Sequence, residues 1–211
     1  MPHILEPLGL ILAGGRSERM GGREKAMLSL GGRPMIAPVV DRLTPQVERL
    51  VINANGNLAR FQGFGLPVLA DTIGGFAGPL AGLLAGMAYS LQAMGGASIV
   101  SVAGDTPFFP ADLVARLRAA QEDDTGRLVL AGSESGVHPT FGLWPATLMG
   151  DLAAYLSAGS RKVGDWTGRH RPMIVTFETV VAGGKHIDPF FNINRPEDLA
   201  QAETLLEAMR S

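Results

Sequence analysis

Short apolar runs alternate with helix-forming segments, and this alternation restricts the fold more than any other feature of the 211-residue chain. Apolar runs of strand length predict buried strands at 8–13, 50–52, 66–69, 98–102 and 128–131. Apolar residues at helical spacing predict helices at 35–43, at 78–93, from 109 onward and after 196. Buried strands separated by helices favour a parallel sheet, and right-handed crossovers place helices on both of its faces. We therefore predict a single-domain, doubly wound α/β fold with a mostly parallel, Rossmann-like sheet over residues 1–211.

The chain has no cysteine, and its 18 Lys and Arg against 20 Asp and Glu give a formal net charge of −2. Disulfide frameworks, Cys-ligated zinc, CxxC redox sites and Cys nucleophiles are thereby excluded. A chain that uses no disulfides fits a reducing compartment, so we expect a cytoplasmic protein. A charge this close to zero argues against binding that depends on neutralising many phosphates of a nucleic acid. Nucleic acid is therefore not an expected partner, whereas small-ligand chemistry stays open.

The stretch 72–104 contains no charged residue, and three of its glycines lie four residues apart, as in the packing face of a membrane helix. A spanning helix needs about 20 continuous apolar residues, and Pro79, Gln92 and Gly95 interrupt this stretch. We expect a buried helix followed by a separate buried strand, and no membrane partner. The first seven residues also lack the pattern of a signal peptide.

A glycine-rich, basic segment follows the first predicted strand and runs from Leu12 to Lys25. Its glycines, Gly14 and Gly15 among them, let backbone N–H groups turn toward an anion, and its basic side chains, such as Arg19, complement phosphate charge. A triphosphate is the ligand that this pattern favours. The segment matches neither the Walker A loop GxxxxGK[ST] nor the dinucleotide pattern GxGxxG. Its composition alone would also suit a solvated loop.

Polar residues follow the other predicted strands. Asp105 comes after the fourth strand, where a carboxylate can hold a hard divalent cation, although an aspartate there can equally cap a turn. Asn53 and Asn55 follow the second strand, and Asp71 follows the third. Ligands of such sheets bind outside the carboxyl ends of the strands, so these groups are suited to ribose hydroxyls or to the N–H edge of a base. They could instead be turn-forming residues.

Several short motifs recur in an order that characterises one family. They are Leu12-Ala13-Gly14-Gly15, Arg19-Met20-Gly21, Lys25, Asn53-Ala54-Asn55, Asp71, Gly78-Pro79-Leu80-Ala81-Gly82, Gly104-Asp105-Thr106-Pro107, His138-Pro139-Thr140 and Phe191-Asn192-Ile193-Asn194. With these motifs the chain resembles the molybdenum cofactor guanylyltransferases, a branch of the glycosyltransferase-A-like nucleotidyltransferases. The resemblance extends over nearly the whole chain, from about residue 8 to residue 206.

The resemblance implies a division of the chain into an N-terminal GTP-binding part and a C-terminal part that binds molybdopterin. It implies that GTP is bound by Leu12, Ala13, Gly14, Gly15, Lys25, Asn53, Asp71 and Asp105. It assigns Mg²⁺ to Asp105, and catalysis to Lys25, Asp105 and Arg19. It assigns the molybdopterin end to Arg161, Lys162, Asn192 and Asn194. A protein that inserts or receives the cofactor is a further expected partner.

The two asparagines flank Ile193, and alternation along an extended segment would place both amides on one face with the isoleucine directed into the core. Alternatively, Asn194 caps the final helix and Asn192 closes a turn. His138 suits a structural or substrate-binding role better than that of a general base, because a phosphate nucleophile is already anionic at neutral pH. Asp188 and Trp166 have ordinary explanations as a turn residue and a partly buried aromatic.

The implied reaction transfers GMP from GTP to molybdopterin and releases pyrophosphate. Two alternatives remain: a CTP-dependent cytidylyltransferase of the same fold, and a non-catalytic GTP-binding protein. Relatives that use CTP tend to have two alanines before the glycine, whereas this chain has only Ala13 before Gly14, which favours guanine. The presence of both Lys25 and Asp105 weighs against a protein that has lost catalysis.

Overall fold

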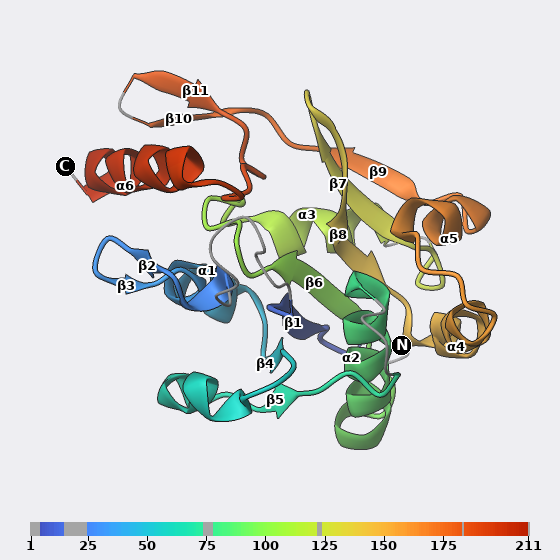
Figure 1. Cartoon of the computed structure of the whole chain (residues 1–211). Helices are drawn as coiled ribbons and strands as arrows, with labels where there is room; N and C mark the ends of the chain where they lie inside the picture. Colours follow the sequence, from blue (N-terminus) through green and yellow to red (C-terminus); the bar gives the residue numbers. More distant parts are fainter. Residues whose placement is uncertain (1–4, 15–24, 74–77, 122–123, 183, 211) are drawn as a thin grey trace.

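The computed structural model describes residues 5–14, 25–73, 78–121, 124–182 and 184–210. Their central element is one seven-stranded sheet (Figure 1). The strand order is β5-β4-β1-β6-β8-β7-β9. The strands are β1 (Leu8–Leu12), β4 (Arg49–Asn53), β5 (Val68–Leu69), β6 (Ile99–Ala103), β7 (Val129–Ser133), β8 (Gly136–Trp144) and β9 (Met173–Thr176). Only β8 runs antiparallel to its neighbours β6 and β7, and the other pairings are parallel. The predicted α/β class and mostly parallel sheet are confirmed.

Helices cover both faces of this sheet. They are α1 (Ile36–Leu43), α2 (Pro79–Met94), α3 (Leu113–Gln121), α4 (Met149–Ser157) and α5 (Val163–Arg169). Side chains alternate between the faces along a strand: Ile11 of β1 packs in a cluster with α1 and α3, while Leu10 packs in a second cluster with α2, α4 and α5. Because both faces are covered, β1 is apolar throughout its length.

The C-terminal helix α6 (Pro196–Arg210) lies to one side of the sheet, above the hairpin of β2 (Ser29–Leu30) and β3 (Arg33–Pro34) in Figure 1. A third apolar cluster joins it to Leu30, Phe108, Ile187 and Ile193. The smaller elements are β2 (Ser29–Leu30), β3 (Arg33–Pro34), β10 (Val180–Ala182), β11 (Lys185–Ile187) and the 3-10 helices η2 (Lys25–Met27), η3 (Thr44–Gln46), η4 (Leu58–Phe64) and η5 (Ala146–Leu148). This cluster brings the C-terminal part of the chain to the same edge as the first strands.

Each predicted strand and helix is present, with ends within a few residues of those expected. The stretch 72–104 forms α2 and β6, as predicted, and within the described ranges no helix combines the length and apolarity needed to cross a membrane. No strand or helix was predicted between residues 132 and 195, where β8, α4, α5, β9 and the β10–β11 hairpin lie. Strand β8 is half exposed at its start and fully buried at its end, so it shows no single hydrophobic period.

Candidate active site

The carboxyl ends of β4, β1 and β6 meet at one edge of the sheet. Leu12 is in register with both Asn53 and Ala103, so the residues that follow these strands are neighbours. Two backbone hydrogen bonds continue the pairing beyond the strands, from Ala13 N to Asn53 O (2.8 Å) and from Gly104 N to Leu12 O (3.0 Å). Gly14 and Asp105 therefore leave the sheet side by side, where ligands of parallel sheets bind.

Lys25 is the centre of the polar cluster at this edge. It lies in η2 and is buried. Its ammonium nitrogen Nζ donates to Asp105 Oδ2 (2.5 Å), to Asn194 Oδ1 (2.6 Å) and to Asn192 Oδ1 (2.9 Å). Three side-chain oxygens from distant parts of the sequence thus converge on one cation. A buried ammonium needs such partners, because an unpaired charge is costly away from water.

The segment that carries the asparagines is fixed by its backbone and by its apolar residue. Ile193 N donates to the carbonyl oxygen of Asp105 (3.1 Å), and the Ile193 side chain is fully buried in the cluster around α6. Both amide oxygens face Lys25, as the alternation predicts. The Asp198 carboxylate accepts from Asn194 N (2.8 Å) and caps the start of α6, so the Asn194 side chain is directed to Lys25 rather than to the helix.

A second polar cluster follows β4 and β5. The Asp71 carboxylate accepts from Asn53 Nδ2 (2.9 Å) and from Asn55 Nδ2 (2.8 Å), and Asp71 N donates to Asn55 Oδ1 (3.0 Å). Asn53 is only 3% exposed, and its Nδ2 also reaches the carbonyl of Leu69 (3.2 Å). The Asp71 carboxylate therefore orients both amides. Asn55 was predicted at this edge beside Asn53, but the family resemblance implied GTP binding for Asn53 and not for Asn55.

Two glycines lie directly against the asparagines of this cluster. A methyl group on Gly82 of α2 would lie 2.2 Å from Asn53 Oδ1, and one on Gly14 would lie 3.3 Å from Asn55 Nδ2. At Gly82 a side chain would clash with Asn53, so glycine is required for α2 to approach so closely. At Gly14 a methyl group would require Asn55 to shift by a few tenths of an ångström. Asn53 Oδ1 faces α2, and no donor to it is found among the described residues.

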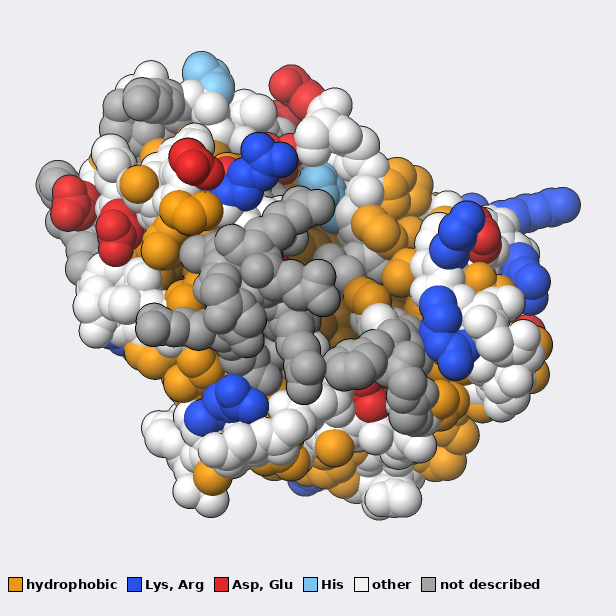
Figure 2. All heavy atoms as spheres, viewed as in Figure 1, with side chains coloured by type: hydrophobic (Ala, Val, Ile, Leu, Met, Phe, Trp, Pro, Cys, Tyr) orange, Lys and Arg blue, Asp and Glu red, His pale blue; other side chains and the backbone are white. Residues whose placement is uncertain are grey.

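Arg161 and Lys162 lie elsewhere. The Arg161 guanidinium donates to the carbonyls of Leu156 (2.6 Å) and Ser160 (2.7 Å) at the end of α4, and the Lys162 carbonyl accepts from the Tyr155 hydroxyl (3.0 Å). In Figure 1, α4 and α5 stand at the side of the sheet opposite α6, and Figure 2 shows Lys and Arg side chains gathered there. The fold does not bring this pair to Asn192 and Asn194, and its role stays a prediction. Gly15 and Arg19 lie outside the described residues.

The β7–β8 hairpin carries a further polar cluster that sequence analysis did not assign to the site. Ser133 Oγ donates to Asp188 Oδ2 (2.6 Å) and lies 2.8 Å from His138 Nε2. Burial alone would raise the pKa of Asp188, but hydrogen bonds from Ser133, Ser135 and the Phe190 N–H outweigh it and lower this pKa overall. Burial lowers the pKa of His138, although the Asp188 charge partly opposes the shift.

These side chains meet across long sequence separations. Asp105 lies 80 residues from Lys25 and Asn194 lies 169 residues from it, so no local spacing could have revealed that they share one cation. The only signal in the sequence was the Asn-x-Asn pattern itself, which indicated that the two amides act together.

Comparison with known proteins identifies the family. Residues 9–173 match the model of the MobA-like NTP transferase domain. The chain belongs to this family. A relative from Mesorhizobium japonicum, a molybdenum cofactor guanylyltransferase, is 48% identical over 204 residues, which cover 96% of this chain and 97% of the relative.

Two solved structures share the fold. The molybdopterin-guanine dinucleotide biosynthesis protein A from Archaeoglobus fulgidus aligns with a TM-score of 0.69 at 21% identity, over 95% of this chain and 98% of that one. A Mycobacterium tuberculosis protein, solved in complex with manganese, aligns with a TM-score of 0.66 at 17% identity, over 93% and 97% of the two chains.

Proposed function

We propose that this nucleotidyltransferase is a molybdenum cofactor guanylyltransferase, which transfers GMP from GTP to molybdopterin and releases pyrophosphate. The observation that carries the proposal is the convergence of Asp105, Asn192 and Asn194 on Lys25 at the ligand-binding edge of the sheet. The close relatives that bear this name support the same activity and favour it over a cytidylyltransferase or a non-catalytic GTP-binding protein.

The nucleoside would bind at the second polar cluster. Guanine presents N–H donors on its Watson–Crick edge, and the cluster offers oxygens: Asn53 Oδ1 and the Asp71 carboxylate. Because Asp71 holds the amide N–H groups of Asn53 and Asn55, the acceptor atoms are presented in a fixed orientation. Leu12, Ala13 and Gly14 would form the floor beside the ribose and phosphates, and Gly15 and Arg19 would complete the phosphate loop.

The residues around Lys25 fit a hard divalent cation. Carboxylate and amide oxygens are the ligands such cations prefer, and three of them already point at one positive charge. In the described part of the chain no three His, Cys, Asp or Glu side chains gather into a metal-binding group. Asp105 would therefore supply one carboxylate and the triphosphate would supply further oxygens, the arrangement that Mg²⁺ favours. When bound, the ion offsets negative charge on the phosphates.

The chemistry needs little beyond positioning and charge. A terminal phosphate oxygen of molybdopterin forms a bond to the α-phosphorus of GTP while the bond to the β-phosphate oxygen breaks, and pyrophosphate leaves with that electron pair. The nucleophile is already an anion, so no general base is required. Lys25 would hold phosphate charge that grows on the leaving group, an electrostatic contribution that acts in a water-excluded site.

Asn192 and Asn194 lie where the nucleotide edge meets the C-terminal part of the chain. They share Lys25 with Asp105, so we place them at the reacting phosphates, with the molybdopterin phosphate approaching from their side. Arg161 and Lys162 would reach only a more distant portion of the acceptor, as a charge complement.

The deciding experiment measures pyrophosphate release with GTP, Mg²⁺ and molybdopterin, and compares CTP in place of GTP. Asp105→Ala should lower turnover by at least roughly a hundredfold. Asp41→Ala is the matched control and should leave turnover unchanged. Asp41 lies on α1 and forms an exposed ion pair with Arg33 of β3. A folded Asp105→Ala protein with near-normal turnover, or equal rates with CTP, would refute the assignment.

A second experiment tests the acceptor end. Asn192→Asp adds a negative charge with almost no change of shape, so it should weaken molybdopterin binding by repulsion of its phosphate. GTP affinity, measured by calorimetry, should also fall, because the new charge lies beside Lys25, but by less than molybdopterin affinity. Equal losses for both ligands would move Asn192 to the nucleotide side of the site.

A further inference from the structure

The segment 188–194 delivers Asn192 and Asn194 to Lys25 without being part of a strand or helix. Its position therefore depends on individual contacts rather than on the hydrogen bonds of a regular element. At its C-terminal end the Ile193 backbone bond to Asp105 and the buried Ile193 side chain hold it. The N-terminal end of the segment follows β11 directly and is held by a different set of contacts.

Asp188 fixes that end through both of its carboxylate oxygens. Oδ1 accepts from the N–H of Phe190 (2.7 Å), and the Asp188 carbonyl accepts from the N–H of Phe191 (3.0 Å), which closes a turn. Oδ2 accepts from Ser133 Oγ (2.6 Å) at the end of β7. The same carboxylate thus shapes the turn and ties it to the central sheet.

The Ser133 hydroxyl is itself held in place. Its single proton goes to Asp188, so its lone pairs accept from Ser135 N (3.2 Å) and from His138 Nε2 (2.8 Å). In the tautomer that carries its proton on Nε2, His138 donates to this hydroxyl. This order differs from a nucleophilic triad, in which the histidine takes the serine proton. The group holds a position rather than activating a nucleophile.

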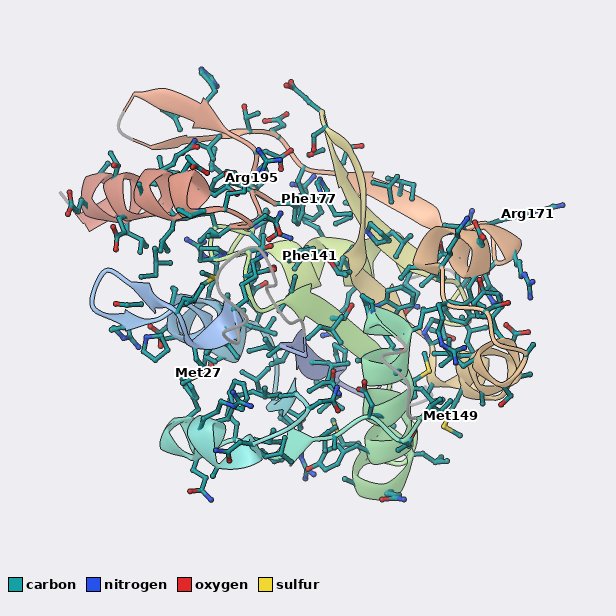
Figure 3. All side chains as sticks on the ribbon, viewed as in Figure 1. Met27, Phe141, Met149, Arg171, Phe177 and Arg195 are labelled. Atoms are coloured by element: carbon teal, nitrogen blue, oxygen red, sulfur yellow. The ribbon has the colours of Figure 1, made fainter. Side chains whose placement is uncertain are left out.

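The apolar side of the same turn packs on the same hairpin. The His138 ring lies 4.4 Å from the Phe190 ring, centre to centre, and Phe190 contacts Phe141 (4.8 Å) and Phe177 (5.5 Å). Figure 3 shows Phe141 and Phe177 between the β7–β8 hairpin and the start of α6. This packing keeps the segment docked even without the carboxylate. What the carboxylate adds is orientation, because charge-assisted hydrogen bonds are short and strong.

We propose that Ser133, His138 and Asp188 form a positioning clamp, which sets where Asn192 and Asn194 present their amide oxygens and so sets cation affinity and the rate of transfer. The inference rests on the proposed function for its kinetic part only. Supporting groups of this kind change metal affinity or activity by about 10- to 100-fold when they are lost.

The test uses the full-length protein with Ser133→Ala, Ser133→Thr and Asp188→Asn, and Asp41→Asn as a control that removes an exposed carboxylate far from the clamp. Mn²⁺ is the probe, and its binding to the protein with and without GTP is followed by the spin-resonance signal of the free ion. We expect Ser133→Ala and Asp188→Asn to weaken Mn²⁺ binding by about tenfold. Ser133→Thr keeps the hydroxyl and should restore it, and Asp41→Asn should match the wild type.

Kinetics give an independent readout. The clamp predicts that kcat falls about tenfold while the KM for GTP changes less than about twofold, since the nucleoside cluster is untouched. The double variant Ser133→Ala/Asp188→Asn should lose less than the sum of the two single losses, because both substitutions break the hydrogen bond that Ser133 and Asp188 share.

Unchanged Mn²⁺ affinity in both single variants would overturn the clamp, as would full additivity in the double variant or failure of Ser133→Thr to rescue. Failure of the proposed function looks different. In that case the wild-type protein releases no pyrophosphate from GTP with molybdopterin, while the Mn²⁺ measurements still decide for or against the clamp.

Discussion

Gly82→Ala should disable the nucleotide site through a single methyl group. The new Cβ would lie 2.2 Å from Asn53 Oδ1, 2.8 Å from Asn53 Cγ and 2.7 Å from Leu12 Cδ2. Carbon and oxygen atoms in contact stay about 3.3 Å or more apart, so the Asn53 amide must move by roughly 1 Å. The amide cannot shift freely, because its Nδ2 donates hydrogen bonds to Asp71 and to the Leu69 carbonyl and the residue is buried.

The cost can be worked out from these contacts. Overpacking of a well-filled site costs about 1–3 kcal/mol, and a buried amide that loses its partners costs about 1–3 kcal/mol more. Alanine gains about 1 kcal/mol over glycine in a helix, which offsets part of this. We expect the free energy of unfolding to fall by roughly 3 kcal/mol, and the melting temperature to fall by roughly 6–12 °C for a chain of this size. GTP affinity should fall at least about tenfold, the equivalent of 1.4 kcal/mol.

Gly86→Ala is the matched control in the same helix. The three atoms nearest to its Cβ would all belong to the Leu10 side chain, the first being Cδ2 at 2.8 Å. A methyl group of leucine can shift more easily than an amide that is held by hydrogen bonds. We expect a loss of about 1 kcal/mol or less and no change in GTP affinity. Urea unfolding and calorimetric titration with GTP test both variants. If the two variants lose equal stability, or if Gly82→Ala keeps wild-type GTP affinity, the role assigned to the close approach is wrong.

Three further predictions concern other parts of the structure. Ser101→Ala leaves the buried Trp144 indole N–H without its 2.7 Å partner, so the free energy of unfolding should fall by about 1–3 kcal/mol with GTP affinity unchanged, and a neutral result in urea unfolding would contradict this. Because the pKa of folded His138 lies below its ordinary 6.5, the unfolded chain binds more protons between the two values, so stability should decline as the pH falls below about 6.5. Melting curves of His138→Gln should lack this part of the pH dependence, and an identical pH profile would refute it. Lys25→Ala should weaken binding of GTP more than of GDP, and of GDP more than of GMP, if the ammonium serves the terminal phosphates; equal losses would place Lys25 near the α-phosphate or the base.

The first two thirds of the chain could be predicted well from the sequence. Buried parallel strands can be recognised in the sequence as short apolar runs. The polar residues that follow these runs lie at one edge of the sheet, because the carboxyl ends of parallel strands meet there. Asp105 and Asp71 were located in this way. The region after residue 131 resisted prediction, because β8 passes from exposed to buried along its length and α4 and α5 are short.

The sequence by itself determined the fold class, the family and the set of polar residues available at the edge of the sheet, since these depend on local patterns and on motif order. Only the tertiary structure decided how those residues are grouped. It joined Asn192 and Asn194 to Lys25 and Asp105, left Arg161 at the end of α4, and tied Asp188 to the β7–β8 hairpin. The physical reason is that side-chain hydrogen bonds across 55 to 169 residues depend on how distant elements pack, which leaves no periodic trace in the chain.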